Sequence, residues 1–378
     1  MTTVFVVNSG SSSIKWELLD AESGSVSSGG IVERIGEPGG GAADHDEGMR
    51  QILAQLGDEH PAVVGHRVVH GGAEFTAATI ITDEVERRLD EISVLAPLHN
   101  PENLKGIRAA RAAFSDVPHV AVFDTAFHGT LPPEAHTYAI DADVAREHGI
   151  RRYGFHGTSY RFVAGRAAEL LGRELSELKL IVFHLGNGAS VCAIDGGRSV
   201  DTSMGMTPLE GLVMGTRSGD IDPGALFHLG RAGMTLPELD LLLNRRSGLL
   251  GMTGTGDMRD VQSAADAGDE NAQAALAVYY HRLRHYLGAY LVGLGGADAI
   301  VFTAGVGENN AATRRATVKG LEGFGIELDD AANTAAERDE RDIAAANSAI
   351  RVLVIPTNEE LQIAREAVAA TTTHRRRA

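Results

Sequence analysis

The chain has 378 residues, of which 43% are hydrophobic, 22% charged and 5% aromatic, and its formal net charge at pH 7 is −17. This length is enough for two domains that each bury a core, and the acidic balance argues against nonspecific binding to nucleic acid or to an anionic membrane. The single cysteine, Cys192, lies in an apolar run and is expected to be a buried thiol. No apolar stretch reaches 18 residues and no basic signal-peptide start is present, so we expect a cytoplasmic protein without a membrane partner.

The chain opens with a predicted β-hairpin that carries small polar groups at its tip. Residues 4–7 form an apolar run typical of a buried strand, and residues 14–19 alternate apolar and polar side chains as a second strand does. Between them, Asn8, Gly10 and the serines that include Ser11, Ser12 and Ser13 supply several donors and no bulk, which suits a phosphate. An ordinary polar turn explains this hairpin equally well when it is taken alone.

The rest of the N-terminal half alternates strands and helices, and one of its strands is unusually polar. The pattern predicts, in order, a Gly- and acid-rich region (20–60), a buried strand (62–70), an amphipathic helix capped by Thr82 or Asp83 (84–95) and a strand that ends in Asp124 (119–124). The strand at 62–70 carries His66, Arg67 and His70 among its apolar residues.

After residue 150 the opening pattern returns. Residues 180–183 predict a strand, residues 184–190 a Gly-rich turn and residues 191–195 a second strand. This unit lies about 176 residues after the opening hairpin, when Gly10 is set against Gly186. A repeat at nearly half the chain length predicts a duplicated fold, with two similar domains facing a cleft.

The C-terminal half adds a long helix and two more strands that run into polar turns. The helix predicted at 272–294 has an apolar stripe that indicates core or subunit contact. Strands predicted at 299–302 and 352–355 lead into 303–309 and into a helix that starts at Glu359. Strands alternating with helices indicate the α/β class.

Several familiar nucleotide and metal motifs are absent from the sequence. It contains no Gly-Lys pair, and therefore no Walker A loop, and no HExxH or paired CxxC motif. A nucleotide therefore has to be held by the Gly-rich turns.

Two arginines lie in surroundings that are unfavourable for solvation. Arg67 is inside an apolar strand, and Arg217 is in the segment 214–223. A buried guanidinium requires an anionic partner. The partner is either a substrate or a structural carboxylate, and Asp220 and Asp222 are candidates for Arg217.

Four more residues have both a catalytic and a structural explanation. His156 lies in a glycine-flanked loop, where it is either catalytic or a satisfied core histidine. Asp124 is either catalytic or a helix cap. Asn8 and Glu359 can share a hard cation that takes few protein oxygens, although Glu359 can equally complement a helix dipole.

Taken together, these segments resemble the acetate kinase family, within the actin, hexokinase and Hsp70 superfamily. The resemblance covers nearly the whole chain in order, and its motifs begin with Asn8-Ser-Gly-Ser-Ser-Ser13, Gly65-His-Arg-Val-Val-His-Gly-Gly72, Phe123-Asp-Thr-Ala-Phe-His128 and Arg152-Tyr-Gly-Phe-His-Gly-Thr-Ser159. They continue with His184-Leu-Gly-Asn-Gly188, Asp201-Thr-Ser-Met-Gly-Met-Thr-Pro208, 214–223, 303–309 and Pro356-Thr-Asn-Glu-Glu360. The resemblance implies duplicated ribonuclease H-like (actin-like ATPase) domains that flank a nucleotide cleft. We place the N-terminal domain at 1–147 plus 361–378 and the C-terminal domain at 148–360.

The resemblance also implies ATP-dependent phosphorylation of acetate to acetyl phosphate, with a role for each matching position. Transition-state stabilisation falls on His156 and Arg217, the family's acid/base assignment on Asp124, and metal binding, by Mg²⁺ or alternatively Mn²⁺, on Asn8 and Glu359. The carboxylate and acyl group of the substrate map to Arg67, Val69, Leu98, Phe155 and Pro208. Contacts to ATP or ADP map to Ser11, Ser12, Ser13, Lys15, His184, Leu185, Gly186, Asn187, Gly188, Asp257, Met258, Arg259, Gly305, Val306, Gly307, Glu308 and Asn309.

Departures from the family pattern concern the periphery of the site. Tyr160 stands where the family commonly has histidine, 253–257 is a looser match to the nucleotide loop, and the chain is trimmed near 36–50 and 340–350. Two alternatives stay open: a kinase of propionate or butyrate, and a non-catalytic sensor on the same fold. The resemblance further implies a homodimer, for which Tyr280–Leu291 is the suggested apolar surface.

Overall fold

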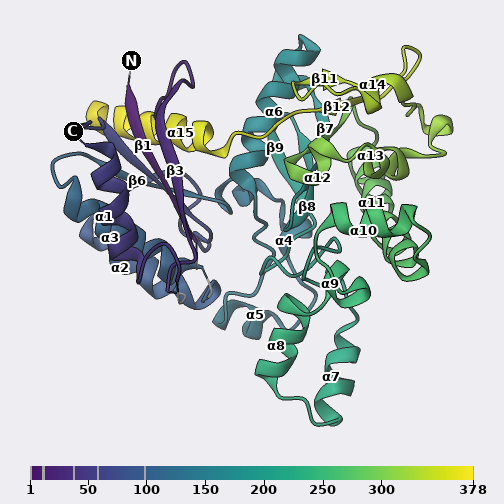
Figure 1. The fold of residues 1–378 in the computed structure, drawn as a ribbon, viewed down its shortest axis with the longest axis horizontal. Coiled ribbons are helices and arrows are strands. Elements are labelled where there is room, and N and C mark those ends of the chain that lie inside the picture. The colour runs from purple at the N-terminus through teal and green to yellow at the C-terminus, as the bar shows by residue number, and fades with distance from the viewer. Residues whose placement is uncertain (1, 11–12, 37–38, 58, 98, 378) are drawn as a thin grey trace. The chain divides into compact units, whose positions relative to one another are not determined.

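The computed structural model describes residues 2–10, 13–36, 39–57, 59–97 and 99–377. The chain divides into two compact units, which are described separately (Figure 1). Unit 1 comprises 1–129, 155–162 and 358–378, and unit 2 comprises 130–154 and 163–357. The domain limits expected from the sequence differ from these mainly at 130–162, and as limits of domains they stay a prediction.

Unit 1 is built on a six-stranded mixed sheet in the order β3-β2-β1-β4-β6-β5. Its strands are β1 (Thr3–Ser9), β2 (Ser13–Asp20), β3 (Val26–Glu33), β4 (Val63–Val68), β5 (Thr79–Ile80) and β6 (His119–Phe123). Its helical segments are α1 (His45–Leu56), α2 (Asp83–Glu91), η1 (Ile92–Leu95), α3 (Asn100–Ala113), η2 (Ala126–Thr130) and α15 (Glu359–Arg377). β1 pairs antiparallel with β2 and parallel with β4, and β4 is parallel to β6.

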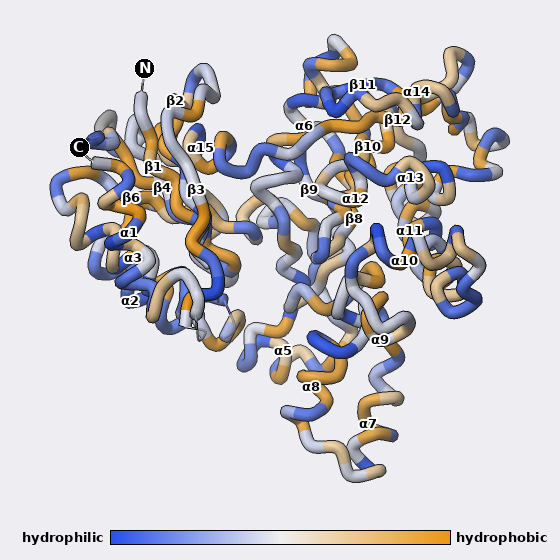
Figure 2. The backbone as a smooth tube through the Cα atoms, viewed as in Figure 1, coloured by the Kyte–Doolittle hydropathy of each residue, from blue (hydrophilic) through white to orange (hydrophobic). Residues whose placement is uncertain are grey.

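The core of unit 1 lies on both faces of this sheet. Apolar side chains of β1 and β2, such as Phe5 and Trp16, pack with α1 and α3. Figure 2 shows β1 as largely hydrophobic. α15 packs directly against β4, because Gly65 has no side chain: a Cβ there would lie 2.9 Å from Cγ2 of Ile363. The C-terminal segment thereby brings Glu359 to the same unit as β4.

Unit 2 repeats this architecture with a sheet in the order β11-β12-β10-β7-β8-β9. Its strands are β7 (Lys179–Leu185), β8 (Ala189–Asp195), β9 (Arg198–Thr202), β10 (Ala299–Thr303), β11 (Arg341–Asp342) and β12 (Arg351–Val354). Its helical segments are α4 (Pro133–His136), α5 (Ala142–Glu147), α6 (Gly157–Leu171, whose first residues belong to unit 1), η3 (Leu175–Glu177), α7 (Pro223–Arg231), α8 (Leu236–Arg245), α9 (Gly248–Thr253), α10 (Met258–Asp266), α11 (Glu270–Leu294), α12 (Ala304–Asn309), α13 (Ala311–Val318), η4 (Glu322–Phe324) and α14 (Asp330–Thr334).

The two sheets correspond strand for strand. β7 pairs antiparallel with β8 and parallel with β10, as β1 does with β2 and β4. Each sheet also ends in a two-residue antiparallel edge strand, β5 or β11. The predicted duplication and the predicted α/β class are therefore confirmed.

Some local predictions were incomplete. The region 20–60 contains β3 and α1, although the sequence predicted neither a strand nor a helix there. The stripe on α11 is largely core, because Leu276, Leu283 and Leu287 are buried within unit 2. Cys192 is buried, as expected. In the described part of the chain no helix is long and apolar enough to cross a membrane.

Candidate functional site

In unit 1, four separate segments bring polar side chains around Arg67 on β4. Its Nε and Nη2 donate to the two carboxylate oxygens of Asp124, at 2.9 and 2.6 Å. Its Nη1 donates to Oδ1 of Asn8 at 3.1 Å, and Oε2 of Glu359 lies 3.8 Å from its Nε. Parallel pairing of β1, β4 and β6 aligns the ends of these strands, which explains how residues so far apart in sequence meet. We call these four residues the Arg67 cluster.

The Arg67 cluster and its neighbours carry more acidic than basic groups. Burial, together with the neighbouring Asp124 and Glu360 carboxylates, raises the pKa of Glu359 to about 7 in spite of Arg67. Burial alone lowers the pKa of Arg67, but Asp124 and Glu359 raise it above its usual value. Lys15 lies 2.5 Å from Glu360 and is half-exposed, so its ammonium is already paired with a carboxylate of α15.

This acidic excess fits a divalent cation. Burial and the nearby carboxylates raise the pKa of Glu359 to about 7, so a cation beside it would favour the ionised carboxylate, and Asn8 presents an amide oxygen beside the same guanidinium. Within the described ranges, no group of three His, Cys, Asp or Glu side chains is arranged to hold a metal ion. The site therefore suits a cation that takes one or two protein oxygens and completes its shell with water and substrate oxygens.

The loop that carries Phe155 and His156 is attached to the end of β6. The N–H of Gly157 donates to the carbonyl of Asp124 at 2.8 Å, and His128 bonds the Phe155 carbonyl at 2.9 Å. His156 has a φ of 59°, a left-handed conformation that is uncommon for residues other than glycine and often marks a functional site. Phe155 is buried against the ring of His70, next to Val69. Leu98, Ser11 and Ser12 lie outside the described residues.

Unit 2 contains a cavity of about 670 Å³ where three Gly-rich turns meet. Of the residues predicted to bind nucleotide, those that line it are Gly186, Asn187, Asp257, Met258, Arg259, Gly305, Val306 and Asn309. Residues not predicted from the sequence complete the wall: Gly215, Leu249, Gly256, Tyr279, Asn310 and Arg338. The three turns follow β7, α9 and β10, so the sheet and α9 position them together. We call this space the glycine-turn cavity.

The remaining predicted nucleotide residues of unit 2, including Gly188, are not among those that line the cavity. His184 and Leu185 are buried in β7, and Gly307 is buried in α12. Glu308 accepts a hydrogen bond from the Thr357 N–H at 3.1 Å. Arg314 is 2% exposed and donates from Nη1 to the carbonyls of Gly307 and Glu308, at 2.9 Å each. These residues fix the shape of the turn after β10.

Arg217 lies on a loop of unit 2 and is held by backbone groups. Its Nη1 donates to the Pro208 carbonyl at 2.7 Å. Burial and the neighbouring Arg245 lower the pKa of Arg217. Neither structural partner suggested by the sequence contacts it: Asp220 pairs with Arg282, and Asp222 caps α7. Among the described residues no carboxylate neutralises Arg217, which leaves its charge available to an anion.

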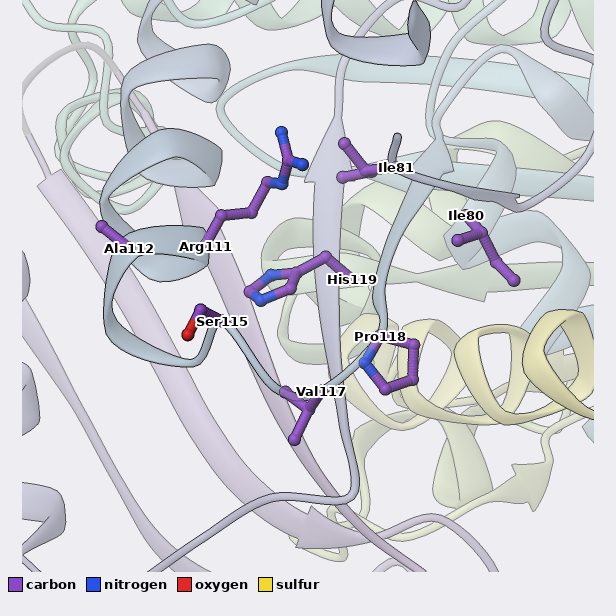
Figure 3. Close-up of a pocket in the computed structure, with 8 residues that line it drawn as sticks. All are labelled: Ile80, Ile81, Arg111, Ala112, Ser115, Val117, Pro118 and His119. Carbon is purple, nitrogen blue, oxygen red and sulfur yellow. The ribbon is translucent and has the colours of Figure 1, made fainter. Parts of the chain in front are cut away.

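A second cavity, of about 430 Å³, lies in unit 1 beside the start of β6. Figure 3 shows Arg111, Ser115, His119 and apolar residues around it. Its arginine is paired with Asp83 and Glu86, and it contains no predicted site residue. We therefore assign the candidate functional residues of unit 1 to the Arg67 cluster, and those of unit 2 to the Arg217 loop and the glycine-turn cavity.

Two sheets of identical order, with a charged cluster in one unit and a glycine-lined cavity in the other, define a protein with duplicated actin-like domains. The chain belongs to the acetokinase family, which it matches over residues 3–365.

Its relatives support this assignment over full length. It is 60% identical to an acetate kinase of Leifsonia xyli subsp. xyli, over 98% of this chain and 99% of the relative. The crystal structure of Porphyromonas gingivalis acetate kinase has a TM-score of 0.93 and 40% identity, covering 98% of this chain and all of that chain. A propionate kinase from Francisella tularensis subsp. tularensis has a TM-score of 0.92 and 37% identity with the same coverage.

Proposed function

We propose that the protein transfers the terminal phosphoryl group of ATP to the carboxylate of acetate, producing acetyl phosphate and ADP in a reversible reaction. The observation that carries the proposal is the Arg67 cluster, in which Asn8, Asp124 and Glu359 surround one guanidinium. The similarity to acetate kinases at up to 60% identity supports acetate as the acid.

Arg67 is the residue that we assign to the carboxylate of the substrate. A guanidinium has five N–H donors in a planar fork. Three of them are used within the cluster: the Nε donor and one Nη2 donor bond to Asp124, and one Nη1 donor bonds to Asn8. Within the described residues, one donor on Nη1 and one on Nη2 stay available, and we assign them to the two oxygens of a carboxylate. Val69, Leu98, Phe155 and Pro208 are proposed to enclose the short acyl group.

Asp124 is proposed to hold Arg67 in place rather than to act as a base. Acetate is already ionised at neutral pH, so its attack on phosphorus requires no proton removal. The bidentate contact to Arg67 supports an orienting role, which differs from the family's acid/base assignment. An Asp124→Asn variant that abolishes a pH-dependent step while binding the metal normally would establish the base role instead.

Positive charge and positioning supply most of the catalysis in phosphoryl transfer. We assign Arg217 and His156 to the oxygens of the transferring group, because Arg217 keeps an unneutralised guanidinium. Direct in-line transfer follows, since the carboxylate itself is the nucleophile. Conversion of Arg217 to alanine should lower turnover by at least ~10³-fold.

The glycine-turn cavity is proposed to hold ATP or ADP, with Ser11, Ser12, Ser13 and Lys15 of the β1–β2 hairpin as further phosphate contacts. Asn8 and Glu359 would hold Mg²⁺, with Mn²⁺ as an alternative. A bound divalent cation would neutralise charge on the phosphates. Glu359, with its pKa of about 7, would have to be ionised for that role.

One assay tests the function and its alternatives. The protein is incubated with ATP, Mg²⁺ and acetate, propionate or butyrate, and hydroxylamine traps any acyl phosphate as a hydroxamate. We expect the largest kcat/KM for acetate, although one methylene changes binding by only about 1–3 kcal/mol. A preference for a longer acid would identify a propionate or butyrate kinase. The absence of hydroxamate with every acid would support a non-catalytic sensor.

We also infer a homodimer, as the family resemblance implies, in the cytoplasm, where ATP is available. Sedimentation should give about 80 kDa, twice the 39.9 kDa of the chain. A mass near that of one chain would refute the dimer. The stripe of α11 is not the proposed contact surface, because Leu283 and Leu287 are buried within unit 2.

A further inference from the structure

The loop that carries Arg217 is closed by hydrogen bonds between Asp220 and Gly211, and we call this pair of residues the neck of the loop. The Asp220 N–H donates to the Gly211 carbonyl at 3.0 Å, and Oδ1 of Asp220 accepts from the Gly211 N–H at 2.8 Å. These two hydrogen bonds join both ends of the segment 211–220. Arg217 lies three residues from the closure, so the position of its backbone depends on the neck.

The same carboxylate fastens the neck to α11. Oδ2 of Asp220 accepts from the hydroxyl of Tyr286 at 2.9 Å and from Nη1 of Arg282 at 3.3 Å. Burial, together with Asp220, raises the pKa of Tyr286, so the phenol keeps its proton and stays a donor. Since α11 is anchored in the core through Leu283 and Leu287, it provides a rigid support for the loop.

The loop also requires glycine at two positions, one in the neck and one beside it. Gly219 has a φ of 69°, and a Cβ there would lie 2.4 Å from the Leu212 carbonyl oxygen. Gly211 has a φ of 110°, and its Cβ would lie 2.7 Å from the Ser203 carbonyl oxygen. Both glycines therefore permit the close approach of segments that the hydrogen bonds of Asp220 hold together.

We propose that Asp220, held by Tyr286 and Arg282, is a positioning residue that fixes Arg217 for phosphoryl transfer. The inference rests on the proposed role of Arg217. This positioning role explains why Asp220 does not neutralise Arg217. The Asp220 carboxylate binds Tyr286 and Arg282 on α11, so the loop is held in place while the Arg217 guanidinium keeps its charge. Displacing a catalytic group by about 1 Å can cost about 10²-fold in rate.

The experiment compares three variants in two backgrounds. Tyr286→Phe removes one hydrogen bond to Asp220 without changing the loop. Asp220→Asn turns an amide toward the donors of α11. Tyr290→Phe is the matched control, because it removes a second phenol from the same helix, one that lies near Asp201. Each variant is made in the natural protein and in an Arg217→Ala background. For each protein we measure kcat, the KM for ATP, the KM for acetate and the melting temperature.

We expect Tyr286→Phe to lower kcat about 5- to 10-fold, as loss of one hydrogen bond allows, and Asp220→Asn to lower it about 10²-fold. Both KM values should stay within about twofold, and Tyr290→Phe should keep normal turnover. In the Arg217→Ala background the effects on kcat should fall to within about twofold, because a residue that acts through Arg217 has nothing left to position.

The outcomes separate this inference from the proposed function. If Arg217→Ala is inactive but Tyr286→Phe turns over normally, the positioning role is wrong and the role of Arg217 stands. Equal losses of kcat in both backgrounds would also overturn the positioning role, since they indicate a general structural effect. Near-normal turnover of Arg217→Ala would refute both. Tyr286→Phe keeps the test decisive if Asp220→Asn fails to fold.

Discussion

Replacement of Arg67 by alanine should damage stability and activity by separate routes. The substitution removes a bidentate partner of Asp124, whose side chain is only 2% exposed. Glu359 and Glu360 lie in the same acidic group, and Lys15 is already paired with Glu360. The variant therefore leaves a buried carboxylate without compensation.

The size of the expected loss of stability follows from the burial of the Arg67–Asp124 ion pair. Removing one partner of a buried ion pair costs about 3–5 kcal/mol. Because the Arg67 side chain is 23% exposed, water screens part of the loss, and we expect a value near the lower limit, ~3 kcal/mol. A change of this size lowers the melting temperature by ~10 °C in a unit of this length.

The defect should depend on pH in a defined direction. Without Arg67, whose charge lowers the pKa of Glu359, the folded-state pKa of Glu359 rises further above its unfolded value from its starting point of about 7. A group whose folded pKa is raised loses stability as pH rises through that pKa. The difference between the variant and the natural protein should therefore shrink as the pH is lowered from 8 to 5.

The double variant Arg67→Ala/Asp124→Asn separates the two routes. Removing the uncompensated charge should restore much of the melting temperature, while turnover stays at least ~10³-fold below normal because no guanidinium binds the substrate. Arg87→Ala, which breaks an exposed pair with Glu84, should change little and serves as the control. An Arg67→Ala protein that melts within 2 °C of the natural protein, or a double variant that recovers turnover, would refute this reasoning.

Three further predictions concern other parts of the two units. Burial lowers the pKa of His66 and of His119 (Figure 3), with nearby Arg111 adding to the effect, so each stays neutral when folded. Below about pH 6.5, the free energy of unfolding should fall by about 1.4 kcal/mol per pH unit for each of these histidines. The fall should be smaller in the His119→Gln variant, and urea titrations at pH 7.5 and 5.5 measure the difference. Gly215→Ala should raise the KM for ATP, because its Cβ would lie 2.1 Å from Oδ1 of Asn187 in the cavity wall; an unchanged KM would contradict this. Arg314→Met should lower stability by about 2–4 kcal/mol by leaving buried carbonyls unpaired, which a denaturant titration measures.

Much of the architecture was predictable because it depends on local patterns. The apolar run of β1 and the Gly-rich turn after β7 are visible in the sequence, and their repeat at half the chain length predicts the duplication. β3 was missed because its sequence, Val-Ser-Ser-Gly-Gly-Ile-Val-Glu, has little apolar alternation and forms only by pairing with β2. α1 was missed because an interior glycine and an acid-rich start conceal its buried face.

The site was predictable in composition but not in its contacts. Tyr279, Asn310 and Arg338 line the glycine-turn cavity, yet each lies in a segment whose sequence is explained by helix packing or loop solvation. Their side chains reach the cavity only through packing between segments far apart in the chain. A prediction from local spacing has no access to that information.

The two arginines illustrate this limit most clearly, because the sequence describes both in the same way and the structure gives them opposite surroundings. Arg67 is held by side chains, and its carboxylate neighbours raise its pKa. The Arg217 side chain is held by the Pro208 carbonyl, and burial beside another arginine lowers its pKa. A guanidinium neutralised by Asp124 orients a substrate through the direction of its remaining donors, at little electrostatic cost. An unneutralised guanidinium gains most when negative charge arrives next to it, as it does on the oxygens of a transferring phosphoryl group. We therefore propose that the acids that surround Arg67 and are absent around Arg217 assign substrate binding to the first arginine and transition-state stabilisation to the second.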